Sequence, residues 1–310
     1  MEINQWPDVP SWAALVKEHA EATFFHTPLW HDIIVKTYPK YSIATREFTF
    51  DDGSKAVIPL IATSAGDFFK TKTRLKSSVF GTYGGIIAKG QLSRKHQGQL
   101  YNLLRNSKAS ISINTNPFSG QDLTDSFACK NTFTQVFFLQ PEEKLLFRCF
   151  SRGAKSNLNQ AKKKGLTIRT ARTEQDLATY YTVYQDTLRR WGNAVIFKYP
   201  EEIFINIFKM GGDSGKIWLA EKDGIIIAGA VVFYWNTIVS YWQGAALQDY
   251  FACYPNNMLH LEIIKEAALK GYRYYDFGPS GGQEGVIRFK KSFGAVKRPF
   301  IAGHCRYARE

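Results

Sequence analysis

The chain has 310 residues, a length typical of two domains of about 150 residues each. Hydrophobic residues make up 45% of the sequence and aromatic residues 15%, which is enough for sizeable cores and excludes an intrinsically disordered chain. The excess of 40 Lys and Arg over 27 Asp and Glu gives a net charge of +13, which favours a phosphate-bearing partner.

Several protein classes are excluded by what the sequence lacks. No stretch approaches the roughly 18 consecutive apolar residues that a membrane span requires, and the first residues lack the regions of a secretory signal. The four cysteines have no C-x-x-C spacing and the six histidines no metal-binding spacing, so we expect neither a metal site nor a disulfide framework. We therefore expect a cytoplasmic protein with no transmembrane segment.

The first half predicts an α/β module with a hairpin near its start. Its elements are predicted as helices over 11–22 and 28–37, strands over 41–50 and 55–61, a helix over 92–107 and a strand over 110–114. Thr27 is the expected N-cap of the second helix. Asp52-Gly53 predicts a two-residue turn with positive φ at both positions, and Pro59 predicts a strand at a sheet edge.

The second half predicts the same order of elements. Thr173 and Asp176 form a capping box. The helix that they begin carries an apolar stripe at Leu177, Tyr181, Tyr184, Leu188 and Trp191. The elements that follow are predicted as strands over 216–220, 225–235 and 237–243, a helix over 257–270 and a strand over 272–277.

The repeated order indicates duplication of one α/β module, with chance agreement of a coarse pattern as the alternative. The expected fold class is α/β with mixed sheets, in two tandem modules. We place the first module at residues 1–143 and the second at 144–310, with the option that the C-terminal strand packs on the first module.

Motifs spread over nearly the whole chain resemble those of the FemAB family, which is built from two GNAT-type acyltransferase modules. The motifs in the second half are the basic segment 151–166, Thr187-x-x-Arg190, Tyr241-x-x-Gly244-Ala245, Asp276-Phe277-Gly278-Pro279-Ser280 and Phe289-Lys290-x-x-Phe293-Gly294. Those in the first half are Phe25-x-Thr27-Pro28-x-Trp30 and Tyr83-Gly84-Gly85. Each motif is weak alone, but together their order is moderately specific.

The resemblance implies an N-acyltransferase that moves an aminoacyl or acyl group to an amine. The implied acceptor is phosphate- or nucleotide-linked, such as a muropeptide precursor of the peptidoglycan cell wall. The implied donor is an aminoacyl-tRNA or an acyl thioester, with no tightly bound cofactor. tRNA is therefore a candidate partner, and no DNA partner is expected.

The resemblance assigns catalytic roles to Lys290, Tyr241 and Asp276. Lys290 would stabilise negative charge on the carbonyl oxygen, an effect worth roughly 2.7–4 kcal/mol for oxyanion-hole donors; the alternative is a surface lysine at the end of a strand. Tyr241 would donate to a carbonyl or shuttle a proton, or else belongs to the core. Asp276 is the candidate carboxylate of the second module.

Substrate-binding roles fall to Arg190, Lys36, Arg152 and Phe289. Arg190 lies about 200° around the helix from Leu188, so the pattern alone predicts an ordinary surface arginine, whereas the resemblance makes it a phosphate ligand. Lys36 has the same two interpretations. Arg152 belongs to an acid-free basic tract, from Arg148 to Arg172, that could bind tRNA or pyrophosphate, or could simply be solvated. Phe289 could equally be a core residue.

Two departures from the family leave the function open. Asn116 stands where many members have an aspartate, and an amide cannot act as a base. Residues 254–259 lack the glycines with which GNAT enzymes commonly bind coenzyme A. The missing glycines disfavour acetyl-CoA, and together with Asn116 they favour the alternative of a non-catalytic module that binds RNA or another polyanion. A further alternative is an acyl-CoA or acyl-carrier-protein dependent acyltransferase acting on a surface polymer. The sequence leaves the donor, the acceptor, the pathway and the oligomeric state open.

Overall fold

The computed structural model divides the chain into two compact units. It describes residues 1–5, 7–65, 72–77, 79–90, 92–107, 109–120, 123 and 127–305. Unit 1 comprises residues 1–134 and 298–310, and unit 2 comprises residues 135–297. Each unit combines helices with strands, which confirms the predicted α/β class. The module boundary at 143/144 remains a prediction, and the compact units themselves change over at 134/135 and 297/298.

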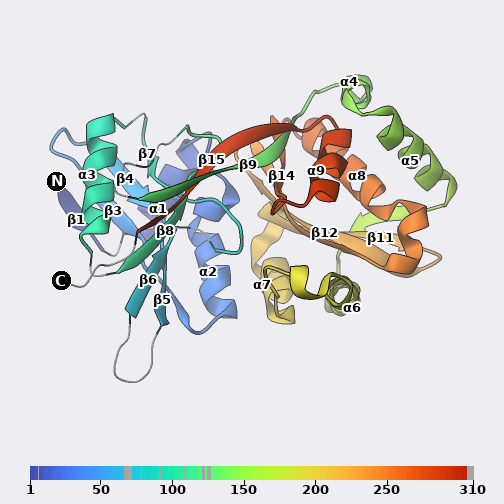
Figure 1. Cartoon of the computed structure of the whole chain (residues 1–310), viewed down its shortest axis with the longest axis horizontal. Coiled ribbons are helices and arrows are strands. Elements are labelled where there is room, and N and C mark those ends of the chain that lie inside the picture. Colours follow the sequence, from blue (N-terminus) through green and yellow to red (C-terminus); the bar gives the residue numbers. More distant parts are fainter. Residues whose placement is uncertain are drawn as a thin grey trace. The chain divides into compact units, whose positions relative to one another are not determined.

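Unit 1 contains two sets of paired strands, ordered β1-β3-β4-β7 and β2-β5-β6-β8 (Figure 1). Its strands are β1 (Glu2–Asn4), β2 (Tyr41–Ile43), β3 (Arg46–Thr49), β4 (Lys55–Ile58), β5 (Ile61–Ala65), β6 (Lys72–Lys76), β7 (Ile87–Ala88) and β8 (Ser110–Asn114). Its helices are α1 (Val9–Glu18), α2 (Pro28–Thr37) and α3 (Arg94–Arg105). The C-terminal strand β15 (Val296–Cys305) pairs antiparallel with β8 through residues 302–305.

Two turn predictions in unit 1 are wrong in instructive ways. The β3–β4 hairpin forms, but only Gly53 has positive φ there, and the Phe50 N–H donates to the Ser54 carbonyl across a three-residue loop. A loop of this length needs the left-handed conformation at one residue only. Pro59 lies just after β4, which pairs on both sides with β3 and β7, so it ends an internal strand rather than marking an edge.

Unit 2 is a sheet with helices on both faces. Its strands are the end of β9 (Ala128–Phe138), β10 (Thr167–Thr170), β11 (Gly215–Lys222), β12 (Ile225–Trp235), β13 (Ile238–Ala246) and β14 (Tyr274–Pro279). Its helices are α4 (Glu143–Cys149), α5 (Arg152–Lys163), α6 (Glu174–Trp191), α7 (Glu201–Gly211), α8 (Pro255–Leu269) and α9 (Glu284–Ser292). In Figure 1, α6 and α7 cover one face of the strands, and α5, α8 and α9 lie over the other.

The core of unit 2 lies between this sheet and helices α5 and α8. Helix α8 is apolar on most sides, so Leu259, Ile263 and Ile264 are all buried against the strands. Helix α5 buries only Ala154, Leu158 and Ala161 at helical spacing and leaves its basic side chains outside. No helix among the described residues is long and apolar enough to cross a bilayer.

Candidate active site

Strands β13 and β14 separate after a short parallel pairing. Ser240 and Asp276 form the last recorded pair, whereas β13 continues to Ala246 and β14 to Pro279. On its other side β13 carries a bulge, because Trp242 has no partner between the residues that pair with Val231 and Val232 of β12. Bulges re-aim side chains and are common beside active sites. Three predicted catalytic residues lie on elements that meet here.

Lys290 lies in the interior of unit 2 and is only 3% exposed. It belongs to α9, and its Nζ donates to the carbonyl oxygens of Gly278 at 2.7 Å and Pro279 at 3.1 Å, the last two residues of β14. The interpretation as a surface lysine at a strand end is therefore wrong. An ammonium has three N–H groups, so these two bonds leave one for another acceptor.

The charge of Lys290 is balanced by a buried carboxylate. Burial lowers the pKa of Lys290 to about 8, and the charge of Asp276 opposes that shift. Asp276 is 1% exposed, and its Oδ1 accepts the N–H of Gly278 at 2.9 Å. Buried charges persist only when they are paired or hydrogen-bonded, so the two carbonyls and the nearby Asp276 favour the charged form of Lys290.

The hydroxyl of Tyr241 lies over the diverged part of β13. A Cβ at Gly244 would overlap Tyr241 Oη, so glycine at 244 makes room for the phenol. Burial raises the pKa of Tyr241 to about 12, which keeps the hydroxyl protonated and able to donate at neutral pH. Tyr241 also packs on the core of unit 2, in line with the alternative that it is a core residue.

His260 of α8 joins these residues and was not singled out from the sequence. Its ring lies 4.8 Å from that of Tyr241 and 5.5 Å from that of Phe289, and its Nδ1 is 2.7 Å from the hydroxyl of Tyr275. Burial, with the charge of Lys290 as a second cause, lowers the pKa of His260 to about 3. The imidazole is therefore neutral, and it packs between the rings of Tyr241 and Phe289. Phe289 is partly buried and packs on the core of unit 2.

Arg190 lies at the end of α6 beside the last residue of β13. Its Nη1 donates to the carbonyl of Ala246 at 3.2 Å, and its guanidinium stacks 4.7 Å from the ring centre of Phe251. Its side chain is 24% exposed, so the prediction of an ordinary solvent-facing arginine from the helical pattern is wrong. The ion pair with Asp186 is long, at 3.5 Å.

The other predicted substrate ligands, Arg152 and Lys36, lie on α5 and α2. Arg152 is the first residue of α5 and is exposed. The N–H of the preceding residue, Ser151, donates to the carbonyl of Ser292, the last residue of α9. The start of α5, with Arg152, therefore lies beside the end of α9. Lys36 is exposed on α2 of unit 1. Their roles in binding remain predictions.

Asn116 has a structural role inside unit 1. It is 1% exposed, its Nδ2 donates to the carbonyl of Glu21 at 2.7 Å, and its Oδ1 accepts the N–H of Phe118 at 3.0 Å. A carboxylate could make only the second of these bonds, because it has no donor for the Glu21 carbonyl. The amide at this position thus fits its surroundings.

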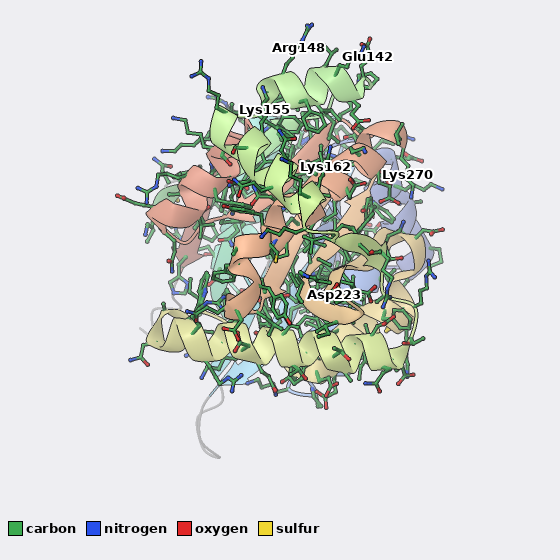
Figure 2. The ribbon with its side chains drawn as sticks, turned by 90° about the vertical axis from the view of Figure 1, so that its right-hand side faces the viewer. Glu142, Arg148, Lys155, Lys162, Asp223 and Lys270 are labelled. Atoms are coloured by element: carbon green, nitrogen blue, oxygen red, sulfur yellow. The ribbon has the colours of Figure 1, made fainter. Side chains whose placement is uncertain are left out.

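Six cations of α4, of α5 and of the residue that follows α5 form what we call the basic face, and all but the half-buried Lys155 are exposed. Its members are Arg148, Arg152, Lys155, Lys162, Lys163 and Lys164. Figure 2 shows Arg148, Lys155 and Lys162 along these helices. Among the described residues no ion pair is recorded for these six cations, and the sequence has no carboxylate between Glu143 and Glu174. Uncompensated cations of this kind attract polyanions.

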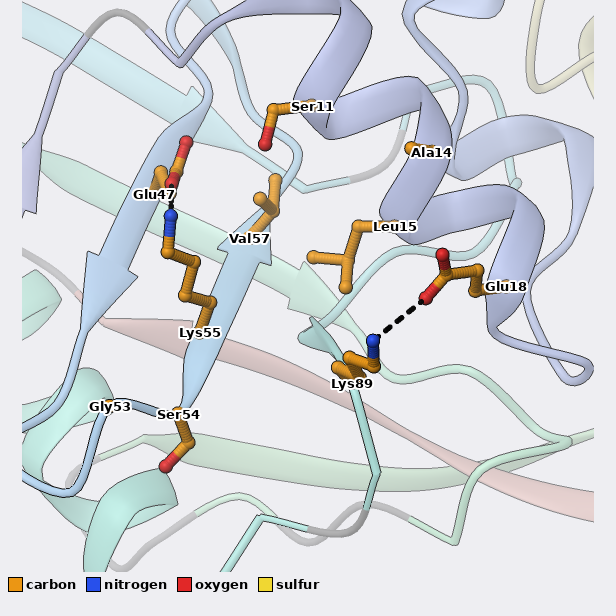
Figure 3. A pocket seen from close by; sticks show the side chains of 10 residues that line it. All are labelled: Ser11, Ala14, Leu15, Glu18, Glu47, Gly53, Ser54, Lys55, Val57 and Lys89. Carbon is orange, nitrogen blue, oxygen red and sulfur yellow. Dashed lines mark ion pairs between the residues drawn. The ribbon is translucent and has the colours of Figure 1, made fainter.

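A shallow pocket of about 350 Å³ lies within unit 1, and no predicted site residue is among those that line it (Figure 3). It is lined by α1, the β3–β4 hairpin and Lys89. Its charged groups pair with each other, Lys55 Nζ with Glu47 and Lys89 Nζ with Glu18, at 3.7 Å each. Because these pairs are exposed and self-compensated, the pocket offers no chemistry that the predicted site lacks.

The geometry of unit 2 combines a buried cation, a protonated phenol and a buried carboxyl group where two strands diverge. This set can stabilise an oxyanion and move a proton. In the part of the chain that the structure describes, no three His, Cys, Asp or Glu side chains are placed to hold a metal ion.

Comparison with known proteins supports this fold. Residues 150–291 match the model of the acetyltransferase (GNAT) domain family. The structure of FemX superposes with a TM-score of 0.72 at 16% identity, over 97% of both chains. The C-terminal domain of a lysylphosphatidylglycerol synthetase from Agrobacterium fabrum gives 0.60 at 13% identity, over 95% of this chain and 91% of that one.

A tandem GNAT protein from the clavulanic acid biosynthesis pathway covers both chains completely, with a TM-score of 0.55 at 9% identity. No curated protein sequence matches the chain. The resemblance inferred from the motifs is therefore confirmed at the level of fold: the chain has the fold of FemX and of tandem GNAT proteins, and residues 150–291 match the GNAT domain family.

Proposed function

We propose that the chain is an N-acyltransferase that moves an aminoacyl group to an amine of a phosphate- or nucleotide-linked acceptor, such as a cell-wall precursor. The observation that carries the proposal is the buried ammonium of Lys290, held by two carbonyls where β13 and β14 diverge. Burying an unneeded charge is costly, and perturbed charges in such positions mark functional sites. The likeness to FemX and the GNAT domain supports acyl transfer as the reaction.

The reaction is a direct attack with no covalent enzyme intermediate. The acceptor nitrogen bonds to the carbonyl carbon of the donor, and the carbonyl π electrons move to its oxygen. Lys290, with its remaining N–H, stabilises this oxyanion. The C–O bond of the donor ester then breaks and the leaving oxygen takes up a proton. The nitrogen loses a proton, and Tyr241 and Asp276 are the groups that would relay protons during transfer.

Arg190 is the proposed ligand of the acceptor phosphates. Its planar fork of donors suits phosphate oxygens, and its present partners are weak enough to exchange: a carbonyl, the ring of Phe251 and a long ion pair. Lys36 is the proposed second phosphate ligand. Phe289 supports this region through its packing on His260.

The proposed donor is an aminoacyl-tRNA that contacts the basic face. Six cations with no recorded ion pair fit a phosphate backbone, and Arg152 connects this face to the end of α9. A second function, binding of RNA or another polyanion without catalysis, is favoured by the same cations. The two are separated by transfer assays, because only the first requires Lys290.

The decisive experiment replaces Lys290 by alanine, with Lys291→Ala as its matched control on the same helix. The substrates are aminoacyl-tRNA and a nucleotide-linked muropeptide. Lys290→Ala should lower transfer at least about tenfold, a loss of about 1.4 kcal/mol of transition-state stabilisation, whereas Lys291→Ala should retain the rate. Equal transfer by Lys290→Ala and the unmodified chain would reject the catalytic assignment.

A further inference from the structure

The free edge of β13 is defined by the direction of its backbone groups. The N–H of Leu247 donates to the carbonyl of Ile227 at 2.9 Å, towards β12. Successive residues of a strand direct their backbone groups to opposite sides, so those of Ala246 and Gly244 point away from β12. That is the side from which β14 has diverged after Ser240.

Side chains of the same unit occupy this edge. The N–H of Ala246 donates to Thr187 Oγ1 at 3.2 Å, and the same hydroxyl lies 3.3 Å from the Ala246 carbonyl, to which it donates. Arg190 donates to that carbonyl as well. A single hydroxyl can both accept and donate, so Thr187 makes the two bonds that a neighbouring strand would make.

The next outward-pointing residue along the edge is partly occupied too. Gln243 Nε2 donates to the carbonyl of Gly244 at 3.0 Å. The hydroxyl of Tyr180, on α6, donates to Gln243 Oε1 and so fixes the orientation of the amide. Of the four backbone groups of Gly244 and Ala246, three therefore have partners within unit 2.

The start of α8, beyond the end of β13, is similarly short of donors. Pro255 is its first residue and has no N–H. The N–H groups of Asn257 and Met258 both donate to the carbonyl of Tyr254, at 3.1 and 3.3 Å. A helix start binds phosphate through N–H groups that lack a partner, and at the start of α8 Pro255 has no N–H and that of Asn257 is already bonded.

We infer that Thr187 is a specificity-determining residue, which closes the edge of β13 against donors carried on an extended, amide-containing arm such as the pantetheine of coenzyme A. Such an arm would add to the edge as a strand does, through the groups that Thr187, Arg190 and Gln243 already bind. The GNAT match implies coenzyme A as donor, and the residues present do not fit it. The inference excludes coenzyme A as the donor of the proposed acyl transfer. It rests on the proposed function for its biological role, whereas its tests measure exchange and binding alone.

The test compares the unmodified chain with Thr187→Ala, which removes the hydroxyl and makes room, and Thr187→Ser, which keeps the hydroxyl. Thr182→Ala is the matched control, because Thr182 lies on the exposed side of the same helix and bonds only within it. Amide hydrogen exchange at Ala246 is measured by NMR. Binding of pantetheine and of coenzyme A is measured by calorimetry.

Exchange at Ala246 should become at least about tenfold faster in Thr187→Ala, and pantetheine should bind at least about fivefold more tightly to this variant. Thr187→Ser and Thr182→Ala should match the unmodified chain, which should bind neither probe below about 1 mM. Micromolar binding of coenzyme A by the unmodified chain would overturn the inference and leave acyl transfer standing with a thioester donor. Faster exchange without tighter pantetheine binding would also overturn it, as would unchanged exchange in Thr187→Ala.

Discussion

Replacing Lys290 by methionine tests whether its ammonium is buried at a cost. Methionine keeps an unbranched chain of similar length and removes the charge. Burial lowers the pKa of Lys290 from 10.5 to about 8. Between these pH values the unfolded chain binds a proton that the folded chain does not, so the free energy of unfolding should rise with pH in the unmodified chain. The variant lacks this contribution.

The size of the effect follows from the two pKa values. A shift from 10.5 to about 8 corresponds to roughly 3.4 kcal/mol, at about 1.36 kcal/mol per unit. Below pH 8 both states are protonated and the cost is constant. From pH 7 to pH 10 linkage gives a gain of about 2.5 kcal/mol in the unmodified chain relative to Lys290→Met.

The assay is urea unfolding at pH 7, 8, 9 and 10, followed by circular dichroism. Lys291→Met is the control, because Lys291 is exposed on the same helix and its difference from the unmodified chain should stay flat. A difference between Lys290→Met and the unmodified chain that stays constant within about 0.5 kcal/mol would refute the burial argument. Groups common to both chains cancel in the comparison.

Two further substitutions test the close contacts. Gly244→Ala should lower the free energy of unfolding by about 1–3 kcal/mol, since its Cβ must displace the Tyr241 hydroxyl. Gly285→Ala is the control: it has open space around its Cβ and should be neutral or slightly stabilising in the same urea assay. Asn116→Asp should lower the free energy of unfolding by roughly 1–3 kcal/mol at pH 7, because the donor to the Glu21 carbonyl is lost. This loss should shrink as the pH falls, because the protonated acid can donate; an equal loss at pH 7 and pH 4.5 would contradict this account.

The position of helix α6 was predictable from the sequence, but the side that it buries was not. The capping box at Thr173 and Asp176 forms, and the helix runs to Trp191. The apolar stripe predicted Trp191 in the core, yet it is 42% exposed, and the buried side includes Thr187 instead. A hydrophobic pattern cannot detect a buried threonine of this kind, because its hydroxyl bonds the backbone of Ala246, which is distant in the sequence.

This rotation also explains Arg190. It lies one turn after Thr187 and therefore shares the side that faces β13. The direction of its guanidinium depends on the edge of β13 that β14 leaves open, because the guanidinium binds the carbonyl of Ala246 on that edge. No local pattern around residue 190 contains that information. The motif resemblance pointed to Arg190, while helical periodicity alone pointed the wrong way.

His260 illustrates a signal that was present in the sequence. Helix α8 carries apolar residues on most of its sides, which is typical of a helix buried all round. A histidine in such a helix must be neutral and must find a hydrogen-bond partner. Its partner, Tyr275, directly precedes Asp276 on β14. The histidine is therefore connected to the site only through the fold.

The burial of Lys290 depends on the type of element that carries it. At 100° per residue, Lys290 lies about 40° from Val286 on a helix, inside the apolar side, whereas Arg288 and Lys291 lie about 200° and 140° away. A helix over residues 284–292 therefore predicts one buried cation among three, and the structure has that pattern, with Lys290 buried and Arg288 and Lys291 exposed. A cation on the apolar side of a helix needs acceptors, and the last two residues of β14 supply them. The lysine and the divergence of the strands are thus parts of one arrangement, and the catalytic proposal requires both.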